Sequence, residues 1–274
     1  MATLDARPGL RQRLNARVRD ETGPRSRASA IVFAPHPDDE VLGCGGTILI
    51  KRRAGTPVAC AFMTDGSTSH RQFMPAENLR HVRMTEAVDA TGLLGIPRED
   101  VHFLEFDDSR LGSFRTVAIE RVVALLRRYR PAEVYVPFRK DGVADHEDTY
   151  AIVLEASRQS GLALEVCEYP VWAWNSWPWV SMRVAPDREF LRAFLDATRS
   201  GAGWRLMRLF EVGICIRDVK DAKRKVLDCY SSQMVAPPGM QGWPTLGDVS
   251  NGDFLECFFG DFEVFRCTVV RRPR

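Results

Sequence analysis

The stretch AIVFAPHPDDEVLGCGG, residues 30–46, decides the fold prediction. Its first five residues are all apolar and predict a buried strand. A turn with one histidine and three acidic residues follows, and the glycines at positions 43, 45 and 46 indicate a Gly-rich turn before a helix over residues 47–54. A buried strand, a polar turn and a helix in this order are typical of the first unit of an α/β sheet.

Short apolar runs continue to alternate with longer helical stretches downstream. Further strands are predicted at residues 58–63, 101–106, 134–137, 164–171, 211–216 and 262–270. Further helices are predicted at residues 78–94, 116–130, 147–159 and 221–231. The pattern predicts a Rossmann-like, mostly parallel sheet that is flanked by helices.

Composition and charge argue against several classes of protein. The 274 residues carry a net charge of +2 from interspersed charges, so we expect no nucleic-acid partner. No run approaches the ~18 apolar residues of a membrane-spanning helix, and the N-terminus lacks the apolar region of a signal peptide. The sequence therefore predicts no integral membrane segment and a cytoplasmic location. It leaves the oligomeric state open and is compatible with a homo-oligomer.

The seven cysteines are scattered singly through the chain, without a Cys-x-x-Cys pair. Such a pair would indicate a thiolate zinc site or a redox dithiol. We therefore expect all seven to be reduced thiols in the core.

Polar side chains follow the C-terminal end of each of the first four predicted strands. They are His36, Asp38 and Asp39 after the first strand, Asp65 after the second, Asp107 and Asp108 after the third, and Lys140, Asp141 and His146 after the fourth. Open α/β sheets bind ligands at these strand ends. A solvated loop explains any one such residue, but four successive strand ends of this kind favour a site.

The turn PHPDDE, residues 35–40, has the composition of a hydrolytic metal site. A neutral histidine and one carboxylate can bind a cation, while the neighbouring carboxylate stays free as a base. The alternative is a helix N-cap, where aspartate is favoured. A metal needs at least a third protein ligand, and His146 fits best because it follows the fourth strand and would face His36 across the crevice.

These residues resemble the PIG-L/LmbE-type zinc-dependent N-acetylglucosaminyl deacetylase family. The matching positions, within residues 29–160, are 34–40 with Gly43, Gly45 and Gly46, then 64–66, Arg83, Glu86, Ala87, 93–95, Asp108, Asp141, Asp145 and His146. The resemblance implies a zinc-dependent hydrolase that removes an N-acyl group, with N-acetyl expected, from an amino sugar or a sugar-containing metabolite. The partner is then a small-molecule or glycan amide substrate.

The resemblance also implies roles at the metal. His36, Asp39 and His146 would hold one zinc ion per chain, although iron, cobalt or manganese also suits such a donor set. Asp38 would be the general base that takes a proton from the attacking water, and Asp145 is the second candidate catalytic residue.

Four further side chains are candidates for substrate binding. Arg83 and Asp108 match family positions that hold the sugar. His70 lies on a loop after the second strand, where it could contact substrate. Trp174 belongs to WAWNSWPW, residues 172–179, which holds four of the six tryptophans and could pack against a sugar ring. The alternative for this tryptophan cluster is a hydrophobic plug over the sheet.

The chain departs from the family pattern Asp-x-His-x-Asp-His, because residues 141–146 read DGVADH. Val143 replaces a histidine that in the family stabilises the oxyanion or protonates the leaving amine. Loss of one such donor commonly costs ~10²–10³ in rate. His70, a substrate hydroxyl or Asp38 itself could take over this role.

Two other functions compete with a deacetylase. A metal-binding pseudoenzyme that recognises a sugar without turnover would explain Val143. A nucleotide-binding Rossmann enzyme is suggested by Gly43, Gly45 and Gly46. The second is disfavoured because His36 and the carboxylates occupy the turn where a pyrophosphate would lie.

The expected organisation is one deacetylase domain over residues 29–274. Residues 29–160 would form its metal-site core, and residues 161–274 would complete the pocket. Residues 1–28 are predicted to be a basic, partly disordered segment, since Arg7 to Arg27 holds seven arginines.

Overall fold

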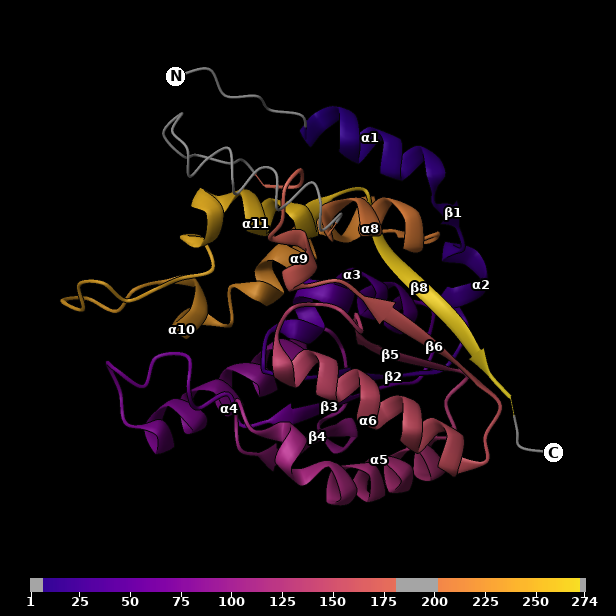
Figure 1. The fold of residues 1–274 in the computed structure, drawn as a ribbon, viewed down its shortest axis with the longest axis horizontal. Coiled ribbons are helices and arrows are strands. Elements are labelled where there is room, and N and C mark those ends of the chain that lie inside the picture. Colours follow the sequence, from indigo (N-terminus) through magenta and orange to yellow (C-terminus); the bar gives the residue numbers. More distant parts are fainter. Residues whose placement is uncertain (1–6, 181–201, 272–274) are drawn as a thin grey trace.

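The computed structural model of the chain describes residues 7–180 and 202–271 (Figure 1). Its centre is a sheet of eight strands. In spatial order these are β1 (Arg19–Asp20), β7 (Val212–Cys215), β8 (Phe262–Val270), β6 (Leu164–Tyr169), β5 (Glu133–Pro137), β2 (Ala30–Ala34), β3 (Val58–Thr64) and β4 (Val101–Phe106). Every pair of neighbours is parallel except the two that β8 forms with β6 and β7. The predicted mostly parallel α/β sheet is confirmed.

Helices cover both faces of the sheet and enclose two hydrophobic cores. The longer helices are α3 (Asp39–Arg53), α4 (Ala76–Leu93), α5 (Arg115–Tyr129) and α6 (Ala144–Ser160). The shorter ones include α1 (Arg7–Arg17), α2 (Thr22–Ser26), α8 (Ala202–Leu209), α9 (Lys220–Leu227), α10 (Ser231–Met234) and α11 (Asp253–Glu256). One core takes its side chains from α3, α4 and α9, and α5 and α6 enclose the other. None of the described helices is both long and apolar enough to cross a bilayer.

The strand order creates a switch point between β2 and β5. From β2 the chain proceeds outwards through β3 and β4, and then returns to β5 and β6 on the other side of β2. The loops that follow β2 and β5 therefore leave the same edge of the sheet in opposite directions. This is the place where open α/β sheets bind ligands.

The three glycines do not form the predicted turn, because α3 begins at Asp39 and includes them all. A Cβ atom on Gly43 would overlap the ring of Tyr169, and one on Gly46 would overlap the side chain of Ile216. These glycines allow α3 to lie close against β6 and the residues after β7. Close packing therefore outweighs the low helix propensity of glycine here.

Within residues 1–28, the segment that the sequence suggests is basic and partly disordered, the structure places α1, β1 and α2; residues 1–6 lie outside the described part. Leu10, Leu14 and Val18 are buried in a hydrophobic core. Leu10 and Leu14, four residues apart, lie on one side of α1 and Val18 follows its end, while the arginines give the segment its polar composition. The segment is further fixed by β1, which pairs with β7.

The prediction of seven reduced cysteines is wrong for two of them. Cys167 on β6 and Cys267 on β8 lie opposite each other in the antiparallel pair and form a disulfide. They are 100 residues apart and belong to no spacing motif, so only the strand pairing brings them together. Cys44 and Cys60 are buried thiols, as predicted.

Candidate metal centre and substrate cavity

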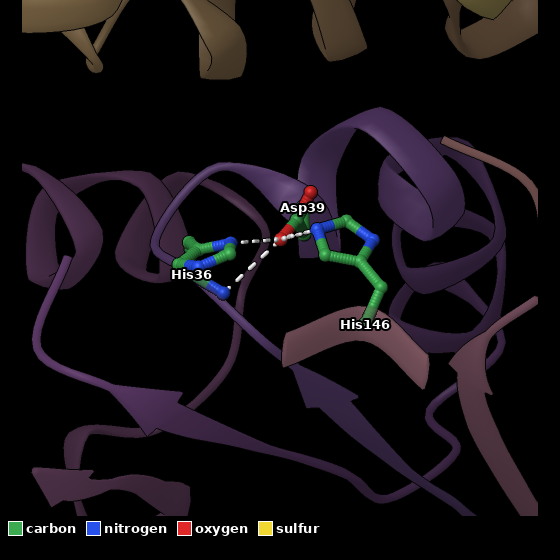
Figure 2. A group of neighbouring side chains, drawn as sticks. All are labelled: His36, Asp39 and His146. Carbon is green, nitrogen blue, oxygen red and sulfur yellow. Dashed lines mark hydrogen bonds and ion pairs between the residues drawn. The ribbon is translucent and has the colours of Figure 1, made fainter. Parts of the chain in front are cut away.

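Three side chains from the switch point lie together (Figure 2). His36 follows β2, Asp39 is the first residue of α3, and His146 is on the first turn of α6. Asp39 Oδ2 lies 3.2 Å from His36 Nδ1 and 3.2 Å from His146 Nε2. The ligand atoms of the three side chains all lie within 4.8 Å of one another. Two imidazoles and a carboxylate form a donor set that zinc accepts, with coordination positions left for water and substrate.

His146 is fully buried, and its two ring nitrogens have different surroundings. Nδ1 lies 2.8 Å from Oδ2 of Asp141, which can fix the ring orientation and tautomer. Nε2 has no hydrogen-bond partner among the described residues and faces Asp39. A buried polar atom without a partner is costly, and a metal ion at this place would satisfy it. The residues present therefore fit a metal.

Asp141 joins this ligand to the chain beyond β6. Besides facing His146, its carboxylate accepts backbone N–H bonds from Val171, Trp172 and Ala173 at 2.9–3.0 Å. It therefore fixes the imidazole and the Trp172 loop together. Sequence reasoning named Asp141 as a polar residue at a strand end and as a family match, but gave it no role, although a carboxylate near a histidine ligand is a common supporting arrangement.

His36 has carboxylates on both sides of its ring. While Nδ1 faces Asp39, Nε2 lies 3.3 Å from Asp145 Oδ2 and 3.4 Å from Asp108 Oδ1. The Asp145 carboxylate also accepts backbone N–H bonds from Ser109 and Leu111. Asp145 thus holds His36 and the loop after β4 in one arrangement.

The electrostatic surroundings favour positive charge between these side chains. Burial alone would lower the pKa of His146, but Asp39 and Asp141 raise it to about 9. Burial opposes protonation of His36 in the same way, and Asp108, Asp145 and Asp39 together raise its pKa well above the ordinary value. Contacts with both histidines hold the pKa of Asp39 well below its usual range despite burial. A bound cation would supply the positive charge that protons supply otherwise.

Asp38 lies beside His36 and Asp39, where its backbone is strained and its carboxylate forms an ion pair. Its φ of 116° is unusual for a residue other than glycine. Its Oδ2 lies 3.0 Å from Nη2 of Arg83, which comes from α4, and its backbone N–H donates to Glu40. Burial raises the pKa of the Asp38 carboxyl to about 7, while Arg83 acts in the opposite direction.

A cavity of about 230 Å³ opens onto these groups. The described residues that line it are His36, Asp38, Asp39, Leu42, Thr68, Ser69, Arg83, Asp108, Ser109, Val143, Trp172, Gln233 and Leu246. Arg83 and Asp108, two of the four predicted substrate contacts, are among them. Val143 also lines the cavity, at the position where the family pattern has histidine.

His70 and Trp174, the other two predicted substrate contacts, are not among the lining residues. His70 Nε2 donates to the carbonyl of Pro244 at 2.8 Å, and its ring stacks on Trp243 with centroids 4.2 Å apart. Burial lowers its pKa. Trp174 is buried edge-on against Trp179. The structure therefore places both rings behind the cavity wall, and Trp172 supplies the aromatic surface.

Sequence reasoning missed several lining residues. Thr68, Ser69 and Ser109 lie on the loops that follow the predicted strands β3 and β4. They were not singled out, because small hydroxyl residues are common in any loop. Gln233 stood out only as part of the pocket-completing C-terminal region. Leu246 gave no signal, because it enters the wall from a loop that no local pattern connects to the metal site.

Comparisons with known proteins match the region of the chain that contains these residues. Residues 31–157 match the family model described as PIG-L: GlcNAc-PI de-N-acetylase. A probable N-acetyl-alpha-D-glucosaminyl L-malate deacetylase 2 from Bacillus cereus is 30% identical over 136 residues, 47% of this chain and 60% of that protein. A diacetylchitobiose deacetylase from Thermococcus kodakarensis is 32% identical over 136 residues, 48% of this chain and 50% of that protein. The matches thus span only 50–60% of the length of these relatives.

A solved structure extends the likeness of the fold to nearly the whole chain. The N,N'-diacetylchitobiose deacetylase from Pyrococcus horikoshii superposes with a TM-score of 0.65 at 19% identity, over 94% of this chain and 90% of that one. The family match covers the strands and helices that carry His36, Asp39 and His146. Over residues 31–157 the chain is therefore similar to the PIG-L family, and over a stretch of 136 residues it is similar to these two deacetylases.

Proposed function

We propose that this protein is a zinc-dependent hydrolase that removes an N-acyl group, N-acetyl in the simplest case, from an amino sugar or a sugar-containing metabolite. The observation that carries the proposal is the set of His36, Asp39 and His146, with a buried His146 Nε2 that faces Asp39 and lacks a hydrogen-bond partner among the described residues. The deacetylase names of the relatives support the same reaction class. The cytoplasmic location stays a prediction.

The proposed reaction is a hydrolysis of the amide C–N bond. His36, Asp39 and His146 would hold the zinc ion, which would supply Lewis acidity and make water acidic near neutral pH. Asp38 takes a proton from the attacking water, whose oxygen adds to the carbonyl carbon. The C–N bond then breaks with its electron pair going to nitrogen, and Asp38 returns the proton to that nitrogen. The products are a carboxylic acid and the free amine.

The use of Asp38 as both base and acid follows from what surrounds it. Val143 offers no proton, and His70 uses one ring nitrogen on the carbonyl of Pro244. Asp38 lines the cavity and lies next to the ligand Asp39. Asp145, the second candidate catalytic residue, is better suited to positioning His36, because it faces His36 Nε2 and two backbone N–H groups.

The sugar is proposed to lie against the polar part of the cavity. Arg83 and Asp108 provide a cation and a carboxylate, and the hydroxyls of Ser69 and Ser109 lie nearby in the same lining. Sugar hydroxyls need such partners when they leave water. Arg83 also fixes the orientation of Asp38, so substrate binding and proton transfer would share one side chain.

A sugar-binding pseudoenzyme is the second candidate, favoured by Val143 at the family histidine position. It would bind zinc and sugar without releasing amine. The intact Asp38 and its ion pair with Arg83 argue against it, because binding alone gives no reason to hold a strained carboxylate beside the ligands.

The test measures amine release and zinc content together. Purified protein is supplied with zinc and assayed with N-acetylglucosamine and N,N'-diacetylchitobiose. We expect amine release that His146→Ala abolishes, while His81→Ala, an exposed histidine on α4, keeps it. Zinc binding with no amine release from any N-acyl amino sugar would favour the pseudoenzyme, and failure to bind zinc would overturn both candidates.

A further inference from the structure

The cavity has a polar side that the sheet topology places over β3 and β4. Thr68 and Ser69 lie on the loop between β3 and α4, and Asp108 and Ser109 lie on the loop after β4. Their polar groups are linked, since the Asp108 carboxylate accepts the backbone N–H of Thr68 and the two hydroxyls of Thr68 and Ser109 are 3.1 Å apart. This side suits a sugar.

The opposite side is apolar. Val143 lies on the loop between β5 and α6, and Trp172 follows β6. These are the residues that the β5 and β6 loops contribute to the described lining. Since β5 and β6 lie on one side of β2 and β3 and β4 on the other, the two sides of the cavity flank the metal ligand His36. Leu42 and Leu246 add further apolar surface and belong to a hydrophobic core.

The apolar side is fixed in place rather than loose. The Trp172 indole stacks on Phe254 of α11, with centroids 5.0 Å apart and planes 21° from parallel. Its backbone N–H donates to Asp141, the carboxylate that faces His146. Asp141 therefore links the position of Trp172 to that of His146. Asp141 uses its own carboxylate on these contacts and offers no free polar group to a substrate.

We propose that the surface of Val143, Trp172 and Leu42 is a subsite for an N-acyl chain longer than acetyl. The inference rests on the proposed amide hydrolysis. If the sugar binds over β3 and β4 and the carbonyl lies at the metal ligands, the substituent on the other side of the carbonyl is the acyl chain. That chain meets an apolar surface, on which methylene groups gain free energy and hydroxyls lose it. Water remains the co-reactant, and the acid released carries the longer chain.

The experiment compares N-acetyl-, N-butyryl- and N-hexanoylglucosamine as substrates of the zinc-loaded full chain. Each buried methylene favours the complex about fourfold, so we expect kcat/KM to be about tenfold higher for butyryl than for acetyl. Hexanoate should also inhibit more strongly than acetate, which measures the subsite without the sugar. Acetyl as the fastest substrate, together with equal inhibition by the two acids, would overturn the subsite and leave the deacetylase standing. Release of amine from none of the substrates would instead count against the proposed function.

Two variants locate the effect. Val143→Thr keeps the side-chain shape but adds a hydroxyl to the apolar side, so the butyryl to acetyl ratio should fall severalfold. Val117→Thr, at a valine on α5 that is 46% exposed, is the matched control and should leave the ratio unchanged. Trp172→Ala, checked for its melting temperature, should remove the preference. A ratio that neither Val143→Thr nor Trp172→Ala changes would overturn the assignment.

Discussion

Two clusters of buried charged side chains lie at opposite ends of the central strands. The carboxyl-end cluster is His36, Asp38, Asp39, Arg83 and His146, which lie on the loops and helices that follow β2, β3 and β5. The amino-end cluster is Arg25 on α2, Lys51 near the C-terminal end of α3 and Glu133 at the start of β5. Both are removed from solvent, but they differ in how their polar atoms are satisfied.

The amino-end cluster is closed. Glu133 lies 2.7 Å from Arg25 Nη1 and 2.6 Å from Lys51 Nζ, and it also accepts the hydroxyl of Tyr135. The Lys51 ammonium donates as well to the backbone carbonyls of Arg25 and Ala28. Such a network satisfies its own charges and joins α2, α3 and β5.

The carboxyl-end cluster is open. His146 Nε2 and Arg83 Nε lack hydrogen-bond partners within the described residues. Two adjacent aspartates, Asp38 and Asp39, are buried together, and one of them has a strained backbone. From this difference we infer that the amino-end cluster, whose charges are paired, stabilises the fold, whereas the carboxyl-end cluster, with unsatisfied polar atoms, is arranged for a ligand.

The largest expected effect concerns Asp38 in the carboxyl-end cluster, where loss of catalysis can be distinguished from loss of the metal. Asp38→Asn removes the proposed base but none of the predicted ligands, so kcat should fall by about 10³ while zinc stays bound. Turnover and metal content are measured on the same preparation. Near-normal turnover with zinc retained would show that Asp38 is not the proton carrier.

The next largest effect is expected in the amino-end cluster. Lys51→Met leaves Glu133 with one cationic partner fewer in a buried place, so the free energy of unfolding should fall by about 3 kcal/mol. Zinc content should not change. Lys225→Met, at an exposed lysine on α9, is the control and should change stability by less than about 0.5 kcal/mol. Loss of zinc from a folded Lys51→Met protein would contradict the separation of the two clusters.

A smaller effect is expected for Asp141, whose carboxylate contacts His146 of the carboxyl-end cluster. Asp141→Asn weakens the contact that holds His146 Nδ1, and zinc affinity should fall about 10- to 100-fold. Competition with a chelator measures the affinity, and Asp107→Asn, at an exposed aspartate, is the control. Unchanged affinity for Asp141→Asn would remove Asp141 from the metal site.

The smallest effect concerns Val143. Val143→His adds a donor to the open cluster at the family histidine position, and we expect kcat for N-acetylglucosamine to rise about tenfold. The gain is below that of an evolved donor because the surrounding groups are not arranged for it. No gain, with the fold and zinc retained, would mean that another group already supplies this proton.

The sequence predicts most of the fold because strand and helix periodicities are local. Residues 30–34 and 262–270 form strands with the predicted bounds, and the helices differ at their ends by a few residues. The helix α3 was predicted too short because glycine lowers helix propensity, whereas Tyr169 and Ile216 require glycine there. The disulfide of Cys167 and Cys267 depends on strand pairing, which no local pattern reveals.

The sequence predicts only those residues of the candidate site that belong to its motifs. His36, Asp39 and His146 belong to short motifs at strand ends, and the structure brings them together; their role as zinc ligands stays a prediction. Trp172 and Trp174 could not be told apart, because only packing decides which indole lines the cavity. The amino-end cluster was not predicted, since its members are 26 to 108 residues apart and each is an ordinary charge by itself.

We expect the carboxyl-end cluster to bind a metal ion and the amino-end cluster to bind none. The measurement is the zinc content of wild type, His146→Ala and Lys51→Met after dialysis against trace zinc. We expect about one zinc per chain in wild type and Lys51→Met and almost none in His146→Ala. Zinc retained by folded His146→Ala, or absent from wild type, would contradict this expectation.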